Sequence, residues 1–348
     1  MARKQKKGGG KRQRAKQRAQ YDELDKYPVL PPHAFARIVR DKQTLNIIYQ
    51  IIEPPMTKKE QEYRDEILDI FIRSLTANIE EIDANPEAYI RTAMDKVIKA
   101  YSMKINKKSK SKIFYYLRRD LIGYGQMDVL MNDINVEDIS MDGTGVPIFA
   151  YHRKFESVET TCVWHTDHDL ESYVIKLAQR CGKHISVASP LLDATLMDGS
   201  RIVMKLGHEI STRGSAFCIR RFKDDPFSPA DIVAFRTMSS LMVAYLWIGF
   251  QNEVPMLFVG GTASGKTTTL NAMCIFIPWQ MKIVSIESTR EVNIPQPNWV
   301  PGLTRQGFGG ESTEGVIGEF ELLKAALRER PEYIIVGEIR GAEAYVLF

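Results

Sequence analysis

Eight consecutive residues, 260–267, have the types and the spacing needed to hold a phosphate group. Their sequence, Gly-Gly-Thr-Ala-Ser-Gly-Lys-Thr, fits the pattern G-x-x-x-x-G-K-[ST]. Glycines allow backbone N–H groups to surround phosphate oxygens, and the helix that follows adds positive potential at its first turn. Lys266 can then reach the terminal phosphates of a nucleotide, and the Thr267 hydroxyl can bind Mg²⁺. We therefore predict an ATP-binding phosphate loop that consists of Gly260, Gly261, Thr262, Ala263, Ser264, Gly265, Lys266, Thr267 and Thr268.

Two glutamates that follow apolar runs are the candidate catalytic acids. Glu287 ends the run 282–286, and Glu338 comes after the run 333–336 and one glycine, Gly337. Acidic side chains at the carboxyl ends of parallel strands face the crevice in which such sheets bind ligands. Glu338 would bind Mg²⁺ and order or deprotonate the attacking water, and Gly337 would leave room for the phosphates. For each glutamate, an ordinary surface position at the end of a strand is the alternative.

The hydrophobic pattern of residues 230–348 predicts the elements that position these side chains. A strand over 256–259 leads through the phosphate loop into a helix over 267–276. Strands over 282–286 and 333–336 follow, and the last of them is expected to be central and buried on both faces. An apolar helix over 241–250 is expected to pack on this sheet. Alternation of helices and strands indicates a parallel α/β sheet, so 230–348 is predicted to be a P-loop ATPase domain.

Three regions are predicted upstream of this domain. Residues 1–26 form a basic tail, 27–110 a helical N-terminal region that starts with an extended proline-containing linker, and 111–225 a smaller α+β domain. Thr57 and Glu60 have the spacing of a capping box, and 109–112 is predicted to be a polar break. The α+β domain includes strands over 202–206 and 217–222. Predicted helices cover 57–75, 86–103, 112–122 and 167–181.

Composition excludes several classes of protein. The 348 residues are 44% hydrophobic and 26% charged, as in ordinary globular domains, so a disordered or fibrous chain does not fit. The apolar segment 241–250 has about half of the roughly 20 residues that a membrane-spanning helix needs. No apolar signal segment follows the basic start, and the four cysteines lack the C-x-x-C spacing of zinc sites. We therefore expect a cytoplasmic protein with reduced thiols.

The basic charge of the chain is concentrated in its first residues. Residues 1–18 contain nine Lys or Arg and no acid. Because the whole chain carries +4, the remaining 330 residues carry −5. A disordered, solvated arm is one interpretation of the tail, and contact with anionic lipid headgroups or with nucleic acid is the other.

Several segments of the chain resemble the secretion-system ATPases of type II and type IV machines, the GspE-like traffic ATPases. Within this family, the archaeal archaellum and pilus motors are the most similar branch. The family's acidic box corresponds to residues 287–291, and its Walker B motif, with a glycine before the glutamate, corresponds to Gly337 and Glu338. The upstream domain resembles the family's second N-terminal domain. The segments that carry the resemblance are GGTASGKTTTLNAM, IESTREVNIPQPNW, LTRQGFGGE, RPEYIIVGEIRGAEA, GYGQMDVLMND, VEDISMDG, LMDGSRI and CIRRF.

The resemblance implies a Mg²⁺-dependent ATPase with a RecA-like fold. Such a protein would form a homo-oligomeric, hexameric ring and would power assembly or export of pilin-like subunits through a polytopic membrane platform protein. It would lie at the inner face of the cell membrane, held there by partners or by the basic tail. In this family, arginines of the upstream domain reach the nucleotide phosphates, which makes Arg201, Arg220 and Arg221 catalytic candidates. A surface or ion-pair role is the alternative for each arginine.

Two features depart from the family pattern. The acidic box usually reads Glu-Asp-Thr, whereas this chain has Glu287, Ser288 and Thr289, so any contact by the aspartate is lost. The family also continues beyond GAEAY into a histidine-containing box, and from this we expect a C-terminally truncated ATPase domain. Two alternatives to an export motor stay open. One is a nucleic-acid translocase, which the net charge of −5 outside the tail argues against, and the other is a nucleotide-binding scaffold without turnover.

Overall fold

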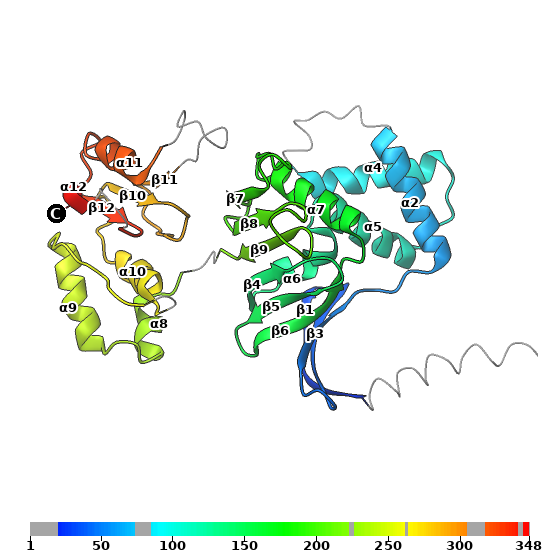
Figure 1. Cartoon of the computed structure of the whole chain (residues 1–348), viewed down its shortest axis with the longest axis horizontal. Coiled ribbons are helices and arrows are strands. Elements are labelled where there is room, and N and C mark those ends of the chain that lie inside the picture. The colour runs from blue at the N-terminus through cyan, green and yellow to red at the C-terminus, as the bar shows by residue number, and fades with distance from the viewer. Residues whose placement is uncertain are drawn as a thin grey trace, which may run out of the picture. The chain divides into compact units, whose positions relative to one another are not determined.

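The chain divides into two compact units, each with its own core. The first consists of 1–176 and 204–221, and the second of 177–203 and 222–348 (Figure 1). Their mixture of helices and strands confirms the predicted α/β class. The basic segment 1–18 lies outside the described residues. The computed structural model describes residues 20–73, 85–222, 226–261, 264–304, 317–339 and 344–347.

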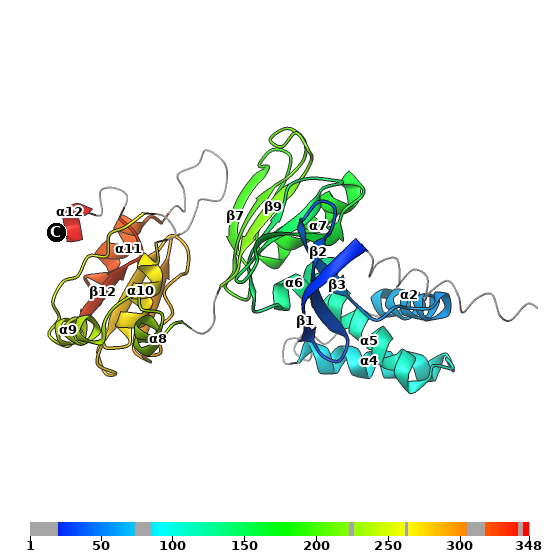
Figure 2. The ribbon, with the colours of Figure 1, turned by 90° about the horizontal axis from the view of Figure 1, so that it is seen from below.

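Nine strands form one sheet in the order β1-β2-β3-β6-β5-β4-β9-β8-β7. β3 pairs with β6 in parallel, whereas β1 with β2, β2 with β3, and β5 with both β4 and β6 pair antiparallel. Helix α7 lies beside this sheet (Figure 2) and buries Leu170, Val174 and Leu177 at helical spacing. The bounds are β1 Tyr21–Leu30, β2 Ala34–Asp41, β3 Ile47–Ile52, β4 Val136–Met141, β5 Pro147–His152, β6 Glu156–Val163, α7 Asp167–Arg180, β7 Leu191–Thr195, β8 Arg201–Lys205 and β9 Ala216–Arg220.

The first three strands correct the prediction of a tail, a linker and a helical region in this part of the chain. β1 begins inside the predicted tail and pairs with β2 along residues that were predicted to be a linker. Pro28 is compatible with pairing because β1 is an edge strand whose register shifts next to this residue. The hydroxyl groups of Tyr27 and Tyr49 both donate to Asp133 Oδ2, at 2.6 and 2.7 Å. These long-range bonds fix the strands, and a local pattern does not reveal them.

Three helices form a separate cluster in the first unit. The predicted capping box is confirmed, since Thr57 N–H donates to Glu60 Oε2 at 2.8 Å and Glu60 N–H donates to Thr57 Oγ1 at 3.3 Å. The predicted break at 109–112 is wrong, because Asn106 caps a helix that runs through it and accepts the N–H of Ser109 at 2.8 Å. The bounds are α2 Lys58–Arg73, α4 Pro86–Ala100 and α5 Lys107–Leu121, followed by η1 Gly125–Met127 and α6 Asp128–Asn132.

A three-stranded parallel sheet with surrounding helices forms the centre of the second unit (Figure 1). β10 lies between β11 and β12, and all five of its residues are buried. Ser228 caps α8 in a capping box with Asp231. The bounds are α8 Pro229–Ala234, α9 Ser240–Gln251, α10 Lys266–Cys274, β10 Ile283–Glu287, β11 Trp299–Leu303, α11 Glu319–Ala326, β12 Tyr333–Val336 and α12 Ala344–Leu347.

This sheet differs from the predicted one. Residues 256–259 are not a strand, and Leu257 and Val259 are 64% and 83% exposed. β12 has a neighbouring strand on one side only among the described residues, and only Ile335 of its four residues is buried, so β10 is the central strand. β11 forms where no strand was predicted. Parallel strands are not joined by a tight hairpin, so neighbouring residues in the chain do not reveal their partners.

Helix α9 packs on the core, as predicted. Val243 and Phe250 belong to the same buried cluster as Ile283 and Ile335 of the sheet. Another face of α9 is open to solvent, and its Leu241 is 80% exposed. Among the described helices, none combines the length and the apolar character that crossing a bilayer requires.

Candidate nucleotide-binding site

The described part of the phosphate loop leads directly into α10, although no strand immediately precedes it among the described residues. Gly265 is the N-cap of α10 and has φ +86°, in the left-handed region that favours glycine. A Cβ atom on Gly260 would lie 2.6 Å from Ser264 Oγ, so the loop closes over a position without a side chain. Thr262 and Ala263 lie outside the described residues. The first turn of α10 therefore presents backbone N–H groups beside the loop, an arrangement that suits an anion.

Lys266 lies back over the phosphate loop. Its Nζ donates to the carbonyl oxygens of Gly260 and Gly261 at 2.9 and 2.6 Å, and Ser264 Oγ also donates to the Gly261 carbonyl, at 2.8 Å. These acceptors are neutral. Because hydrogen bonds from an ammonium group to charged phosphate oxygens are stronger than bonds to neutral carbonyls, a bound phosphate can replace them. Thr267 and Thr268 are half-buried in the first turn of α10.

Glu287, Ser288, Gly337 and Glu338 lie together, and we call them the acidic edge. They meet because β10 and β12 are parallel and pair Ile286 with Val336. The Gly337 N–H donates to the Ile286 carbonyl at 2.9 Å, and Ser288 Oγ donates to Glu338 Oε1 at 3.1 Å. A Cβ atom on Gly337 would lie 3.1 Å from Cγ of Glu287. The absence of a side chain at Gly337 thus permits close contact with Glu287. The sequence had suggested that this glycine leaves room for the phosphates.

Glu287 fixes the loop that follows β10. Its side chain is 2% exposed, and its Oε1 accepts the backbone N–H groups of Glu291 and Val292 at 2.9 and 2.8 Å. Oε2 is buried and has no hydrogen-bond partner among the described residues. Burial raises the pKa of Glu287 to about 7, although the two backbone donors oppose this shift. A carboxyl group of this kind can anchor a loop and hold a proton near neutral pH.

Two side chains that the sequence analysis did not identify join α10 to the loop after β10. Asn271 Nδ2 donates to the Glu291 carbonyl at 2.8 Å, and its Oδ1 accepts the Asn293 N–H at 3.0 Å. Gln296 Nε2 donates to two carbonyls near the end of α10, at 2.9 and 3.0 Å. An amide side chain in the otherwise apolar second half of α10 was the available signal for Asn271. These bonds connect the helix of the phosphate loop to the loop that follows Glu287 and Ser288.

The three candidate arginines contact groups close to them in the fold. Arg201 Nη2 bonds Asp193 Oδ2 at 2.5 Å, and this interaction is the main cause that raises the pKa of Arg201. Arg220 Nε donates to Asp138 Oδ1 at 3.3 Å on an exposed part of the sheet. Arg221 Nη1 donates to the backbone carbonyls of Asp133 and of Val136. The structure therefore gives each arginine a local partner, in line with the ion-pair alternative for Arg201 and Arg220.

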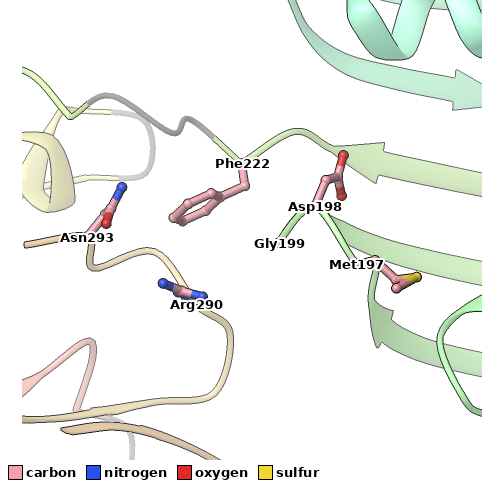
Figure 3. Close-up of a pocket in the computed structure, with 6 residues that line it drawn as sticks. All are labelled: Met197, Asp198, Gly199, Phe222, Arg290 and Asn293. Carbon is pink, nitrogen blue, oxygen red and sulfur yellow. The ribbon is translucent and has the colours of Figure 1, made fainter. Parts of the chain in front are cut away.

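A pocket of about 320 Å³ also lies in the second unit. Arg290 and Asn293 reach it from the loop after β10 (Figure 3), and Arg290 lies over the ring of Phe222 at 5.4 Å. The pocket is lined by Met197, Asp198, Gly199, Phe222, Arg290 and Asn293.

The donors at the site suit Mg²⁺ bound together with a nucleotide. The Thr267 hydroxyl and the Glu338 carboxylate offer hard oxygen ligands, and the Glu287 carboxyl has an unsatisfied buried oxygen. The described residues contain no cluster of three or more His, Cys, Asp and Glu that could hold a metal by itself. Mg²⁺ commonly binds through one or two protein ligands and substrate phosphates, so these donor types are compatible with this ion.

Comparisons with known proteins show which family this chain resembles. A family model described as "Type II/IV secretion system protein" matches residues 155–347. The uncharacterized protein MJ0900 of Methanocaldococcus jannaschii is 36% identical over 327 residues, which are 93% of this chain and 58% of that protein. The type IV secretion system protein VirB11 of Bartonella henselae is 28% identical over 197 residues, 47% of this chain and 54% of that protein.

The chain is also similar to a solved structure of an ATPase. The X-ray structure of the Legionella pneumophila ATPase DotB aligns with a TM-score of 0.42 and 18% identity, and the alignment covers 64% of this chain and 60% of that one. The chain thus spans less than two thirds of the length of each of these three proteins.

Proposed function

The chain belongs to the family of type II/IV secretion system proteins, and from this membership we propose that it is a Mg²⁺-dependent ATPase. One observation carries the proposal. A phosphate loop opens α10, and Asn271 of this helix bonds the loop that leads out of the acidic edge at the ends of β10 and β12. A phosphate-binding helix and a carboxylate at the ends of parallel strands are the parts that phosphoryl transfer to water requires.

Each residue of the site has a distinct role in this proposal. Lys266 exchanges the loop carbonyls for the terminal phosphates of ATP, and the N–H groups of the first turn of α10 bind phosphate oxygens. Thr267 and Glu338 would hold Mg²⁺, which neutralises negative charge on the phosphates when it is bound. Glu338 orients the attacking water and accepts its proton. Glu287 keeps the loop after β10 in place by accepting two of its backbone N–H groups.

The wider role follows from the family. We propose that turnover occurs in a homo-oligomeric, hexameric ring and drives assembly or export of pilin-like subunits in a secretion, pilus or archaellum machine. The ring would lie at the inner face of the cell membrane on a polytopic platform protein. The relative VirB11, named as a type IV secretion system protein, supports a secretion role. The basic tail of residues 1–18 is a second candidate for membrane attachment.

Phosphate release by the purified chain tests the proposal directly. We expect hydrolysis of ATP in Mg²⁺ that stops when the ion is chelated and that does not increase when DNA is added. DNA-stimulated turnover would favour the translocase alternative. Tight binding of ATP without phosphate release would favour the scaffold alternative.

We further propose that at least one of Arg201, Arg220 and Arg221 stabilises the phosphates of a nucleotide, in its own or a neighbouring subunit. An arginine from outside the P-loop domain can contribute 10³–10⁵ in rate. For Arg201, this role requires exchange of the Asp193 carboxylate for phosphate. Mixing Lys266→Ala chains with Arg→Ala chains should restore part of the activity if the contact crosses subunits. Normal hydrolysis by all three single Arg→Ala variants would refute the proposal.

A further inference from the structure

Ser288 makes a direct contact with the candidate catalytic carboxylate. Its Oγ donates a hydrogen bond of 3.1 Å to Glu338 Oε1, across 50 positions of the sequence. Both side chains are exposed at the ends of neighbouring parallel strands. A serine hydroxyl has one hydrogen to donate, and a carboxylate has two oxygens that accept. The contact therefore engages one of the two carboxylate oxygens of Glu338.

Hydrogen bonds of the neighbouring residues fix the backbone at Ser288. The preceding residue, Glu287, is buried, and its Oε1 accepts two N–H groups of the loop that follows. Its carbonyl accepts the Thr304 N–H at 3.0 Å, and on the other strand the Gly337 N–H donates to Ile286 at 2.9 Å. Both partners of the hydrogen bond thus extend from a fixed register. A side chain supported in this way can hold another group within the narrow limits that catalysis needs.

From this contact we propose that Ser288 is a positioning residue that orients Glu338 toward the attacking water. The inference rests on the proposed ATPase function and adds a second residue to it. A serine serves this purpose without adding charge, whereas an acidic residue at position 288 would place a second carboxylate beside the first and repel it. By sequence, Ser288 marks only the loss of an aspartate, whereas in the structure its hydroxyl group contacts Glu338.

Kinetics of three variants of the full chain test the inference. Ser288→Ala should lower kcat about 5- to 50-fold and leave KM and the affinity for Mg·ADP within about twofold, because it removes orientation and not binding. Ser288→Thr keeps the hydroxyl and should recover most of the rate. Ser240→Ala, at an exposed serine on α9, is the matched control and should behave like the parent protein.

A double-mutant cycle separates action through Glu338 from an independent effect. In the Glu338→Gln background, Ser288→Ala should cause no further loss, since the group that it orients is already absent. Equal fold losses in both backgrounds would overturn the inference. A second readout needs no turnover: in the nucleotide-free protein, the ¹³C resonance of the Glu338 carboxyl should move in Ser288→Ala and return in Ser288→Thr. An unchanged resonance would show that the contact is not formed.

The outcomes distinguish this inference from the proposed function. If Glu338→Gln hydrolyses ATP at the parental rate, the catalytic assignment of Glu338 fails, and the role of Ser288 fails with it. If Glu338→Gln is inactive and Ser288→Ala retains the parental rate, only the role of Ser288 fails.

Discussion

The phosphate loop and the acidic edge are built in opposite ways. Contacts of the loop are local: Lys266 and Ser264 bond carbonyls at most six positions away, and Gly265 supplies the turn. Contacts of the acidic edge join residues far apart, with 50 positions between Ser288 and Glu338. The loop therefore depends on a short sequence, whereas the acidic edge depends on the register of two strands.

Because of this difference, we expect substitutions in the phosphate loop and in the acidic edge to have different effects. A change in the loop should affect nucleotide binding, because we propose that its groups bind the phosphates of the ground state. A change in the acidic edge should have one of two effects. At the exposed Glu338 we expect a loss of turnover, and at the buried Glu287 a loss of stability. Variants of both regions can test this division.

The largest effect is expected at the exposed acid of the edge. Glu338→Gln should leave the affinity for ATP within a few fold and lower turnover by 10²–10⁴, the usual contribution of a general base. The amide keeps the shape and the contact with Ser288 but cannot accept the proton of water. Phosphate release and nucleotide binding measured on the same preparations would check this. A mutant with parental turnover would move the catalytic role to Glu287.

Glu287 should instead control stability in a pH-dependent way. Burial raises its pKa to about 7 from an ordinary value of 4.5. The folded chain therefore binds this proton more tightly than the unfolded chain. The associated stability is complete below pH 4.5 and is lost as the pH rises through 7, by up to about 3 kcal/mol. Glu287→Gln should remove this part of the pH dependence while Oε1 still accepts the N–H groups of the loop.

Unfolding by urea at pH 5 and pH 8 measures this effect. The exposed Glu253→Gln, in the same unit, is the control and should keep the parental pH dependence. An identical decrease between the two pH values in Glu287→Gln and in the parent would contradict the assignment of the proton to Glu287.

A substitution in the phosphate loop should have a smaller effect than those at Glu338 and Glu287, and this effect should be on nucleotide binding. Lys266→Ala should weaken MgATP binding at least tenfold, about 1.4 kcal/mol, because it removes the cation that faces the terminal phosphates. Its effect on stability should be slight, since its two acceptors are exposed loop carbonyls that water can serve. Titration of the protein with a labelled nucleotide would measure it. Unchanged affinity would contradict the assignment of this loop.

The same contrast explains what the sequence could predict. The capping box at Thr57, the helix that follows the phosphate loop and the strand that ends at Glu287 are set by neighbouring residues, and the sequence identified them. β1 to β3, β11 and the absence of a strand at 256–259 depend on partners elsewhere in the chain. The local pattern therefore failed to predict β1 to β3 and β11, and it predicted a strand at 256–259 that is absent.

Within the site, the sequence named the acids but not their surroundings. It gave Glu287 and Glu338 similar roles, whereas the structure buries one and exposes the other. The burial of Glu287 depends on the order of the strands in the sheet, and neighbouring residues in the sequence do not reveal that order. The bonds of Asn271 and Ser288 were missed for the same reason, because their partners lie 20 or more positions away.

The smallest effect is expected at Asn271, which links the two regions. Asn271→Ala removes a donor to the Glu291 carbonyl and an acceptor for the Asn293 N–H, and water can replace both at this partly exposed loop. The unfolding free energy should fall by about 1 kcal/mol, the net value of a typical hydrogen bond. Asn298→Ala, which removes one exposed bond of 3.4 Å, is the matched control and should change it less. If Asn271 also transmits the position of α10 to the acidic edge, kcat should decrease with it while nucleotide affinity stays constant. A loss of stability without any change in kcat would show that the phosphate loop and the acidic edge act independently.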